Sequence, residues 1–290
     1  MLVQALNARS RARLHFEPVR RGVLSWNTYA RSGTLRFRLL RAGEAASDWY
    51  DYVHWTGDGR KSYSPQSDRE GIAVDTDVIS AKTPFDGIDV AGGDEDFHLI
   101  AWSSPQRAQA SLPYAREAMI LDVPSRSQYV IEGERGWCSP ASLSMVNAYH
   151  GIDRSVEETA QAVLDYAYNG TGNWSFNTAF SGSLGLRACV AYIRNLDQAA
   201  QLIERNLPIV ISYAWREGEL PGAPLPHSGG HLAVLRGFTS SGDCAVNDPA
   251  APGVAVVYPR RALEAIWQRN DGVAYVIAPV GVEYADILNS

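Results

Sequence analysis

The chain has 290 residues, of which 46% are hydrophobic and 20% are charged, and its formal net charge is −6 at pH 7. This composition is typical of a globular protein, and the length suits one large domain or two ordinary ones. The acidic balance argues against nucleic acid as a partner. No apolar run approaches the length of a membrane span, and the first residues lack the apolar segment of a signal peptide. We therefore expect no membrane span, and a chain that is cytoplasmic as given or secreted if a leader has been removed.

Residues 1–112 are expected to form an antiparallel β-sandwich. Residues 34–40, TLRFRLL, alternate apolar and charged side chains, as in a half-buried strand. Other short β-rich runs follow, separated by clusters of glycine, proline and aspartate. The aromatic side chains of this region favour core packing, and contact with a glycan or the cell wall through this domain stays open as an alternative. These aromatic residues are Trp26, Trp49, Tyr50, Tyr52, Trp55 and Trp102.

Residues 113–290 mix helices and strands and are expected to form an α+β domain. Ser155 and Glu158 have the spacing of a capping box, at the start of a helix that closes near Gly170. Further helices and apolar strands alternate toward the end of the chain. The helices are expected at 196–206 and 259–269, and the strands at 208–215, 231–238, 243–248 and 272–279.

Cys138 lies in the stretch GWCSPASLSMVNAYHG, where a buried helix is expected to begin. Pro140 is tolerated at the first helical position and Ser139 is a suitable N-cap, so the helix is predicted from Pro140 to about Tyr149, stopping at Gly151. The positive end of a helix favours a thiolate. Its free N–H groups could also stabilise an oxyanion. This position therefore predicts a nucleophilic cysteine.

A base and an orienting acid follow in the sequence. His231 comes after Gly229 and Gly230 and opens an apolar strand, and Asp248 comes at the end of the next strand. Two adjacent antiparallel strands could place the imidazole and the carboxylate side by side. Cys138 would then attack, His231 would transfer the proton, and Asp248 would orient the imidazole. The two glycines would let a substrate backbone come close.

Two rival residues remain for these roles. Asn247 could orient the histidine in place of Asp248, and His227 could be the base, although its proline-rich loop holds it less firmly. The chain has three cysteines and no CxxC pair, so neither a metal site nor a cofactor is expected. Cys189 and Cys244 lie in apolar strands and are predicted to be core residues.

The blocks GWCSPASLSMVNAYHG, GGHLAVLRGF and VNDPA resemble, in this order, the catalytic blocks of papain-like cysteine peptidases. More narrowly, they resemble bacterial peptidases related to the bacteriocin-leader (double-glycine) processing family, family thirty-nine of the cysteine peptidases. The resemblance covers about residues 118–280. It implies a C-terminal papain-like domain over 113–290, with helices packed on an antiparallel sheet. It also implies a Cys138–His231–Asp248 triad that hydrolyses a peptide or protein substrate through a thioester.

The resemblance also implies a glutamine in the oxyanion hole, a role that falls to Gln128, ten residues before Cys138. Ser139 stands where the family commonly has glycine, which would narrow the pocket. Trp137 and Trp174 are candidates for lining the substrate groove, and packing between helix and sheet explains them equally well.

Two other classes of function stay open. The same triad could carry out acyl transfer, such as transamidation, in place of hydrolysis. Alternatively, the chain could be a non-enzymatic protein that binds a glycan or another protein and carries a vestigial triad.

Overall fold

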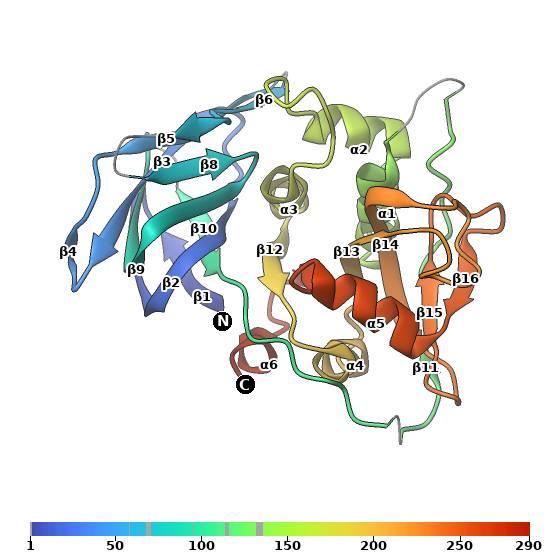
Figure 1. Cartoon of the computed structure of the whole chain (residues 1–290). Helices are drawn as coiled ribbons and strands as arrows, with labels where there is room; N and C mark the ends of the chain where they lie inside the picture. Colours follow the sequence, from blue (N-terminus) through green and yellow to red (C-terminus); the bar gives the residue numbers. More distant parts are fainter. Residues whose placement is uncertain (1, 58, 68–70, 95, 114–115, 132–135) are drawn as a thin grey trace. The chain divides into compact units, whose positions relative to one another are not determined.

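The computed structural model describes residues 2–57, 59–67, 71–94, 96–113, 116–131 and 136–290. The chain divides into two compact units (Figure 1). The first consists of Met1–Pro105 and Gln161–Val190, and the second of Gln106–Ala160 and Ala191–Ser290. Residues 161–190 thus group with the N-terminal strands, and the division into domains 1–112 and 113–290 stays a prediction.

The first unit is built on an antiparallel sheet. Its strands are β1 (Leu2–Ala8), β2 (Arg11–Asn27), β3 (Gly33–Arg41), β4 (Glu44–Ala45), β5 (Tyr50–Thr56), β6 (Gly59–Ser62), β7 (Gln66–Ser67), β8 (Ile72–Asp75), β9 (Val78–Gly92) and β10 (Phe97–Ser103). The main path runs β1-β10-β2-β9-β3-β5-β6. The long strands β2 and β9 pair with two register shifts, which bend them. Hydrogen bonds join all of these strands into one sheet, which bends at the register shifts. The β-sandwich predicted for residues 1–112 would instead have two separate sheets.

Aromatic side chains fill the core of the first unit. Trp26 and Trp102 are fully buried, and Phe176 packs edge-on against Trp26 with ring centroids 5.9 Å apart. Phe176 belongs to α3 (Trp174–Ser183), which the sequence analysis missed because its small polar residues show no helical period. The side chain of Asn173 caps this helix by accepting the N–H of Phe176.

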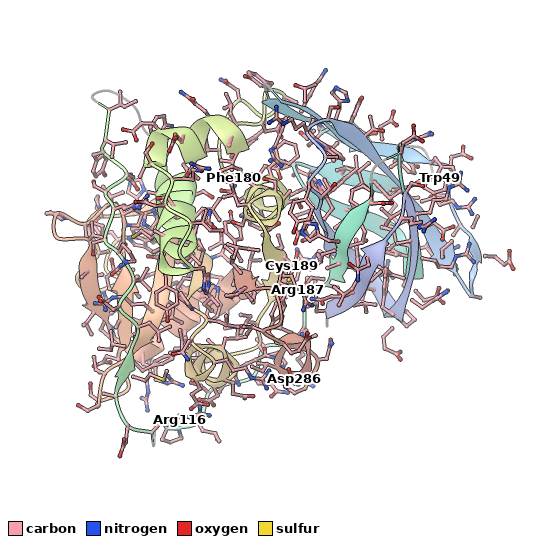
Figure 2. The ribbon with its side chains drawn as sticks, turned by 180° about the vertical axis from the view of Figure 1, so that it is seen from behind. Trp49, Arg116, Phe180, Arg187, Cys189 and Asp286 are labelled. Carbon is pink, nitrogen blue, oxygen red and sulfur yellow. The ribbon has the colours of Figure 1, made fainter. Side chains whose placement is uncertain are left out.

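Most of the aromatic residues considered for sugar binding are therefore core residues, and glycan contact finds no support. Tyr52 and Trp55 are buried as well. Trp49, labelled in Figure 2, differs: it is only half-buried, and the guanidinium of Arg38 lies 5.0 Å from its ring centroid.

The second unit has helices packed on an antiparallel sheet, as expected. Its elements are β11 (Met119–Ile120), α1 (Cys138–Tyr149), α4 (Leu196–Glu204), β13 (Ile209–Trp215), β14 (Ser228–Phe238), β15 (Cys244–Asn247), β16 (Ala255–Tyr258), α5 (Arg260–Arg269), β17 (Val273–Pro279) and α6 (Ala285–Asn289). Two further elements, α2 (Val156–Val163) and β12 (Leu186–Tyr192), contain the boundaries between the two units. The strands follow the order β17-β13-β14-β15-β16, and β11 pairs with β14. Helix α1 lies along β14 and β13 (Figure 1).

Several predicted helix boundaries can be compared with the structure. The capping box is confirmed: the Ser155 N–H donates to the Glu158 carboxylate at 2.8 Å, and the Glu158 N–H donates to the Ser155 hydroxyl at 3.1 Å. Helix α2 ends at Val163, well before the predicted end near Gly170. The short strand β16, in which only Tyr258 is buried, was not predicted. In the part of the chain that the structure describes, no helix is both long enough and apolar enough to cross a membrane.

Candidate active site

Helix α1 begins at Cys138, two residues before the predicted start. Trp137 occupies the N-cap position, and no side chain caps the helix, so the expectation of Ser139 as the cap is wrong. Pro140 fits in the first turn because the first N–H groups of a helix have no intrahelical acceptor. The first intrahelical bond runs from the Ala141 N–H to the Trp137 carbonyl at 3.0 Å. Cys138 therefore lies at the positive end of the helix.

His231 and Asp248 meet across two neighbouring strands. His231 lies on β14 and Asp248 directly follows β15, which pairs with β14 in the antiparallel sense. The His231 Nε2 atom lies 2.8 Å from the Asp248 Oδ1 atom, and both side chains are buried. Asn247 points elsewhere: its amide donates to the Val123 carbonyl at 3.0 Å. His227 is exposed in the loop before β14. The acid in contact with the imidazole is thus Asp248.

The thiol of Cys138 completes this arrangement. Its side chain is hydrogen-bonded to that of His231, and the backbone N–H groups of Leu232 and Ser139 also bond to the sulfur. Because Asp248 takes the Nε2 atom, Nδ1 is the imidazole nitrogen left to face the sulfur. Three donors thus converge on one buried sulfur atom.

These contacts shift the pKa values toward an ion pair. Burial alone would raise the pKa of Cys138, but the hydrogen bond and positive charge of His231 outweigh it, so the pKa is lowered. Burial alone would lower the pKa of His231, but bonds to Asp248 and Cys138 raise it to about 10. Burial likewise opposes ionisation of Asp248, yet its bond to His231 leaves the pKa lowered. The shifts at Cys138 and His231 are both in the direction of a thiolate beside an imidazolium.

The other two cysteines have surroundings that differ from those of Cys138. Cys189 on β12 (Figure 2) and Cys244 on β15 are both 0% exposed, which confirms them as core residues. Burial raises the pKa of Cys244 to about 12. At neutral pH its thiol stays protonated, whereas the environment of Cys138 favours ionisation.

Two tyrosines that were not predicted as site residues donate hydrogen bonds to the Oδ2 atom of Asp248, the oxygen that does not contact His231. Tyr258 donates to the Asp248 Oδ2 atom at 2.7 Å, and Tyr213 donates to the same atom at 3.2 Å. The Ala250 N–H donates to Oδ1 at 2.9 Å. In the sequence nothing distinguishes these tyrosines from core aromatic residues, because the contact depends on the pairing of strands.

Aromatic rings and an open cavity flank the histidine. The rings of Tyr213 and Trp215 pack edge-on against His231, with centroids 5.6 and 5.5 Å away. Trp215 also lines an open cavity of about 530 Å³ together with Gly229. A Cβ atom added at Gly229 or at the neighbouring Gly230 would meet nothing within 4 Å. These glycines are thus at an open surface, as a substrate-binding role requires.

The remaining predicted site residues have different surroundings. Gln128 is buried, its N–H donates to the Pro249 carbonyl at 2.9 Å, and its Oε1 atom has no partner among the described residues. The Ser139 hydroxyl is buried and bonds with the Tyr275 hydroxyl at 2.9 Å. Trp137 is half-buried at the start of α1, next to Cys138. Trp174 begins α3 in the other unit, and its predicted place in the groove stays a prediction.

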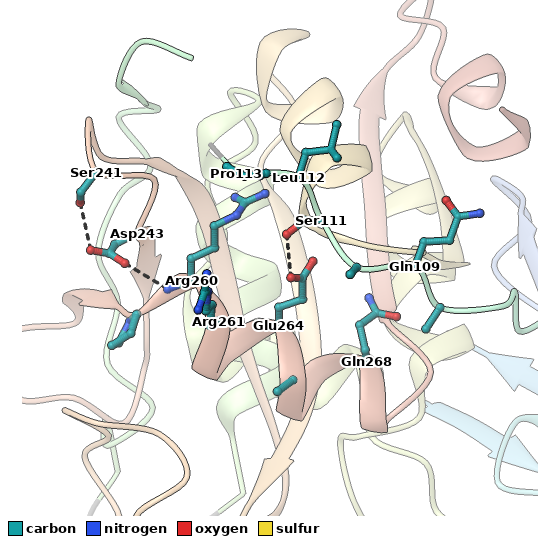
Figure 3. Close-up of a pocket in the computed structure, with 14 residues that line it drawn as sticks. Gln109, Ser111, Leu112, Pro113, Ser241, Asp243, Arg260, Arg261, Glu264 and Gln268 are labelled. Carbon is teal, nitrogen blue, oxygen red and sulfur yellow. Dashed lines mark hydrogen bonds between the residues drawn. The ribbon is translucent and has the colours of Figure 1, made fainter. Parts of the chain in front are cut away.

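Neither a metal cluster nor the cavity beside α5 coincides with this site in the described structure. Within the described ranges, no group of three or more His, Cys, Asp or Glu side chains could hold a metal ion. A cavity of about 860 Å³ lies beside α5 (Figure 3). There the Ser111 hydroxyl donates to Glu264 at 2.7 Å, and the Arg260 N–H donates to Asp243 at 3.1 Å. None of the Cys138, His231 and Asp248 side chains lines it.

Several solved structures are similar to the chain. A putative C39-like peptidase from Bacillus anthracis is 20% identical over 56% of this chain and 98% of its own, with a TM-score of 0.45. A double glycine motif protease from an AMS/PCAT transporter, solved with its leader peptide, is 18% identical over 57% and 100%, with a TM-score of 0.38. The peptidase domain of Streptococcus ComA is 16% identical over 52% and 96%, with a TM-score of 0.39. No curated protein matches.

The sequence itself carries the assignment. Residues 120–275 match the Peptidase_C39 like family. The matched segment contains Cys138, His231 and Asp248, and it spans more than half of the 290 residues. The chain belongs to the Peptidase_C39 like family and is a cysteine-peptidase-like hydrolase.

Proposed function

We propose that the chain hydrolyses peptide bonds by nucleophilic catalysis, with Cys138 as nucleophile, His231 as proton carrier and Asp248 as orienting acid. The observation that carries the proposal is the contact of the Cys138 sulfur with an imidazole whose other nitrogen lies 2.8 Å from a buried carboxylate. A vestigial triad would have no need to retain this geometry, or the lowered pKa of Cys138.

In the first half of the reaction, the thiolate of Cys138 attacks the carbonyl carbon of the substrate. The carbon–nitrogen bond then breaks, and the leaving amine takes the proton from His231 Nδ1. The acyl group remains on the sulfur as a thioester. Asp248 keeps its bond to Nε2 throughout, so the imidazole stays in the orientation in which Nδ1 faces the sulfur.

In the second half, a water molecule gives a proton to the now neutral His231 and attacks the thioester carbonyl. The carbon–sulfur bond breaks, the carboxylic acid product leaves, and the thiolate and imidazolium are restored. No cofactor enters either half, because the nucleophile, the proton carrier and water account for every bond.

The oxyanion that forms in each half needs hydrogen-bond donors. We assign this role to the backbone N–H of Cys138, which belongs to the first turn of α1, and to the side chain of Gln128. In support, Gln128 is buried, and its backbone N–H is bonded to the carbonyl of Pro249, the residue after Asp248. The donor to the oxyanion would be the NH₂ group of its side chain. We place the substrate backbone along Gly229 and Gly230 and beside Trp137. The Ser139 hydroxyl is bonded to the Tyr275 hydroxyl, so Ser139 contributes to the site only through its backbone N–H.

A peptide library incubated with the chain tests the proposal. We expect cleavage by the wild-type protein, loss of turnover with Cys138→Ala, and a covalent adduct on Cys138 when the reaction is quenched with acid. The matched control is Cys244→Ala, which removes a buried thiol away from the site and should keep activity if the variant folds. Adding a primary amine distinguishes hydrolysis from acyl transfer through the product formed.

Full cleavage by Cys138→Ala would refute the mechanism. So would a wild-type Cys138 that reacts with iodoacetamide only at the high pH of an ordinary thiol, because the proposal requires a thiolate near neutral pH.

A further inference from the structure

Asp248 has more hydrogen-bond donors than orienting a histidine requires. Its Oδ1 atom accepts from His231 and from the Ala250 N–H, and its Oδ2 atom accepts from the hydroxyls of Tyr258 and Tyr213. Each carboxylate oxygen has two lone pairs, so these four donors fill the acceptor capacity of the group. A carboxylate that is 0% exposed needs such compensation to stay ionised.

The four side chains come from four neighbouring elements of one sheet. Tyr213 lies on β13 directly opposite His231 on β14, Asp248 follows β15, and Tyr258 ends β16. These strands are adjacent in the order β13-β14-β15-β16. The tyrosines therefore reach the acid from both sides of the strands that carry His231 and Asp248, and they hold Oδ1 toward the imidazole.

We propose that Tyr258 and Tyr213 are positioning residues that keep Asp248 ionised and turned toward His231, and thereby maintain the thiolate of Cys138. This inference rests on the proposed function. It adds two residues that touch neither the sulfur nor the carbonyl under attack and act only through the acid.

The expected direction of the effect follows from charge. The titratable groups that face Asp248 in the described structure are His231, Tyr213 and Tyr258, with Cys138 beyond the imidazole. Burial is the main cause that raises the pKa of both tyrosines, so each stays a neutral donor. Losing a hydroxyl raises the pKa of Asp248, because a bond to its charged form is lost. Without a hydroxyl to hold Oδ2, the carboxylate is also free to turn away from His231. An imidazolium that loses this contact is less stable, so the thiolate forms at higher pH.

The test uses the full chain with Tyr258→Phe, Tyr213→Phe and the double variant. Phenylalanine keeps each ring and removes only the hydroxyl. The matched control is Tyr284→Phe, another fully buried tyrosine of the same unit, just before α6. Two quantities are measured: the pH dependence of Cys138 alkylation by iodoacetamide, resolved by mass spectrometry, and kcat and KM for a library peptide that the wild type cleaves.

We expect each single variant to move the acid limb of alkylation to higher pH and to lower kcat up to about tenfold at pH 7, with KM unchanged. The double variant should show a larger shift than either single variant, and Tyr284→Phe should show none. The inference is overturned if the folded double variant keeps the wild-type pH profile and kcat, or if Tyr284→Phe has the same effect. Failure of the proposed function is distinguishable, because the wild-type chain would then lack rapid alkylation near neutral pH.

Discussion

Replacing Asp248 by asparagine tests how much of the activity depends on the charge of the acid. Asparagine has the same shape, and its oxygen can keep the bonds from His231 Nε2 and the Ala250 N–H. Its NH₂ group would then face the Tyr213 and Tyr258 hydroxyls, which can rotate to accept a hydrogen bond. The variant is therefore expected to fold, and the imidazole should keep its orientation.

The size of the expected loss of activity follows from the attraction between the Asp248 carboxylate and the His231 imidazolium, which the substitution removes. The Nε2 and Oδ1 atoms are 2.8 Å apart, and the charges are spread over both groups. A separation of about 4 Å at an effective dielectric constant of 20 gives roughly 4 kcal/mol, or about 1000-fold, as an upper limit. The imidazolium is present both in the resting enzyme and during the attack, so part of this energy cancels. We expect turnover at pH 7 to fall about 10- to 100-fold.

The pH dependence of turnover shows the direction in which the pKa values of the site change in Asp248→Asn. Without the carboxylate charge, the pKa of His231 falls from about 10 and the pKa of Cys138 rises. The acid limb should therefore move to higher pH and the alkaline limb to lower pH. The assay is cleavage of a library peptide from pH 5 to 10, with urea unfolding as a check on folding. An unchanged profile, or a folded variant as inactive as Cys138→Ala, would refute this account of the acid.

Two further predictions concern reactivity and stability. In the native chain, iodoacetamide should label Cys138 below pH 7, because the pKa of its thiol is lowered. It should leave Cys244, whose thiol pKa is raised by burial, unlabelled until the chain unfolds. Equal labelling of the two cysteines in the native chain would contradict this prediction. Gly237→Ala should destabilise the chain by at least about 2 kcal/mol, because a Cβ atom would lie 2.0 Å from the Met119 carbonyl and φ is +155°. Gly229→Ala is the control in the same unfolding experiment, since its Cβ would be unhindered; similar midpoints would contradict the prediction.

The sequence alone determined the local part of the site. A cysteine before a run of small and apolar residues indicated the helix start, because only the first turn of a helix tolerates proline and offers free N–H groups. The error of two residues at the start of α1 arose because Pro140 fits anywhere in that turn. The capping box of Ser155 and Glu158 was likewise predictable from residues three positions apart.

Long-range contacts were decided by the tertiary structure. The choice between Asp248 and Asn247 depends on which neighbouring side chain β15 turns toward β14, and the sequence left both open. The tyrosines on Asp248 depend on the order β13-β14-β15-β16, which brings residues 213 and 258 to one carboxylate. The grouping of α3 with the N-terminal strands depends on burial of Phe176 beside Trp26. Local patterns report on neighbours along the chain, whereas the packing that sets a pKa brings together groups that are distant in the sequence.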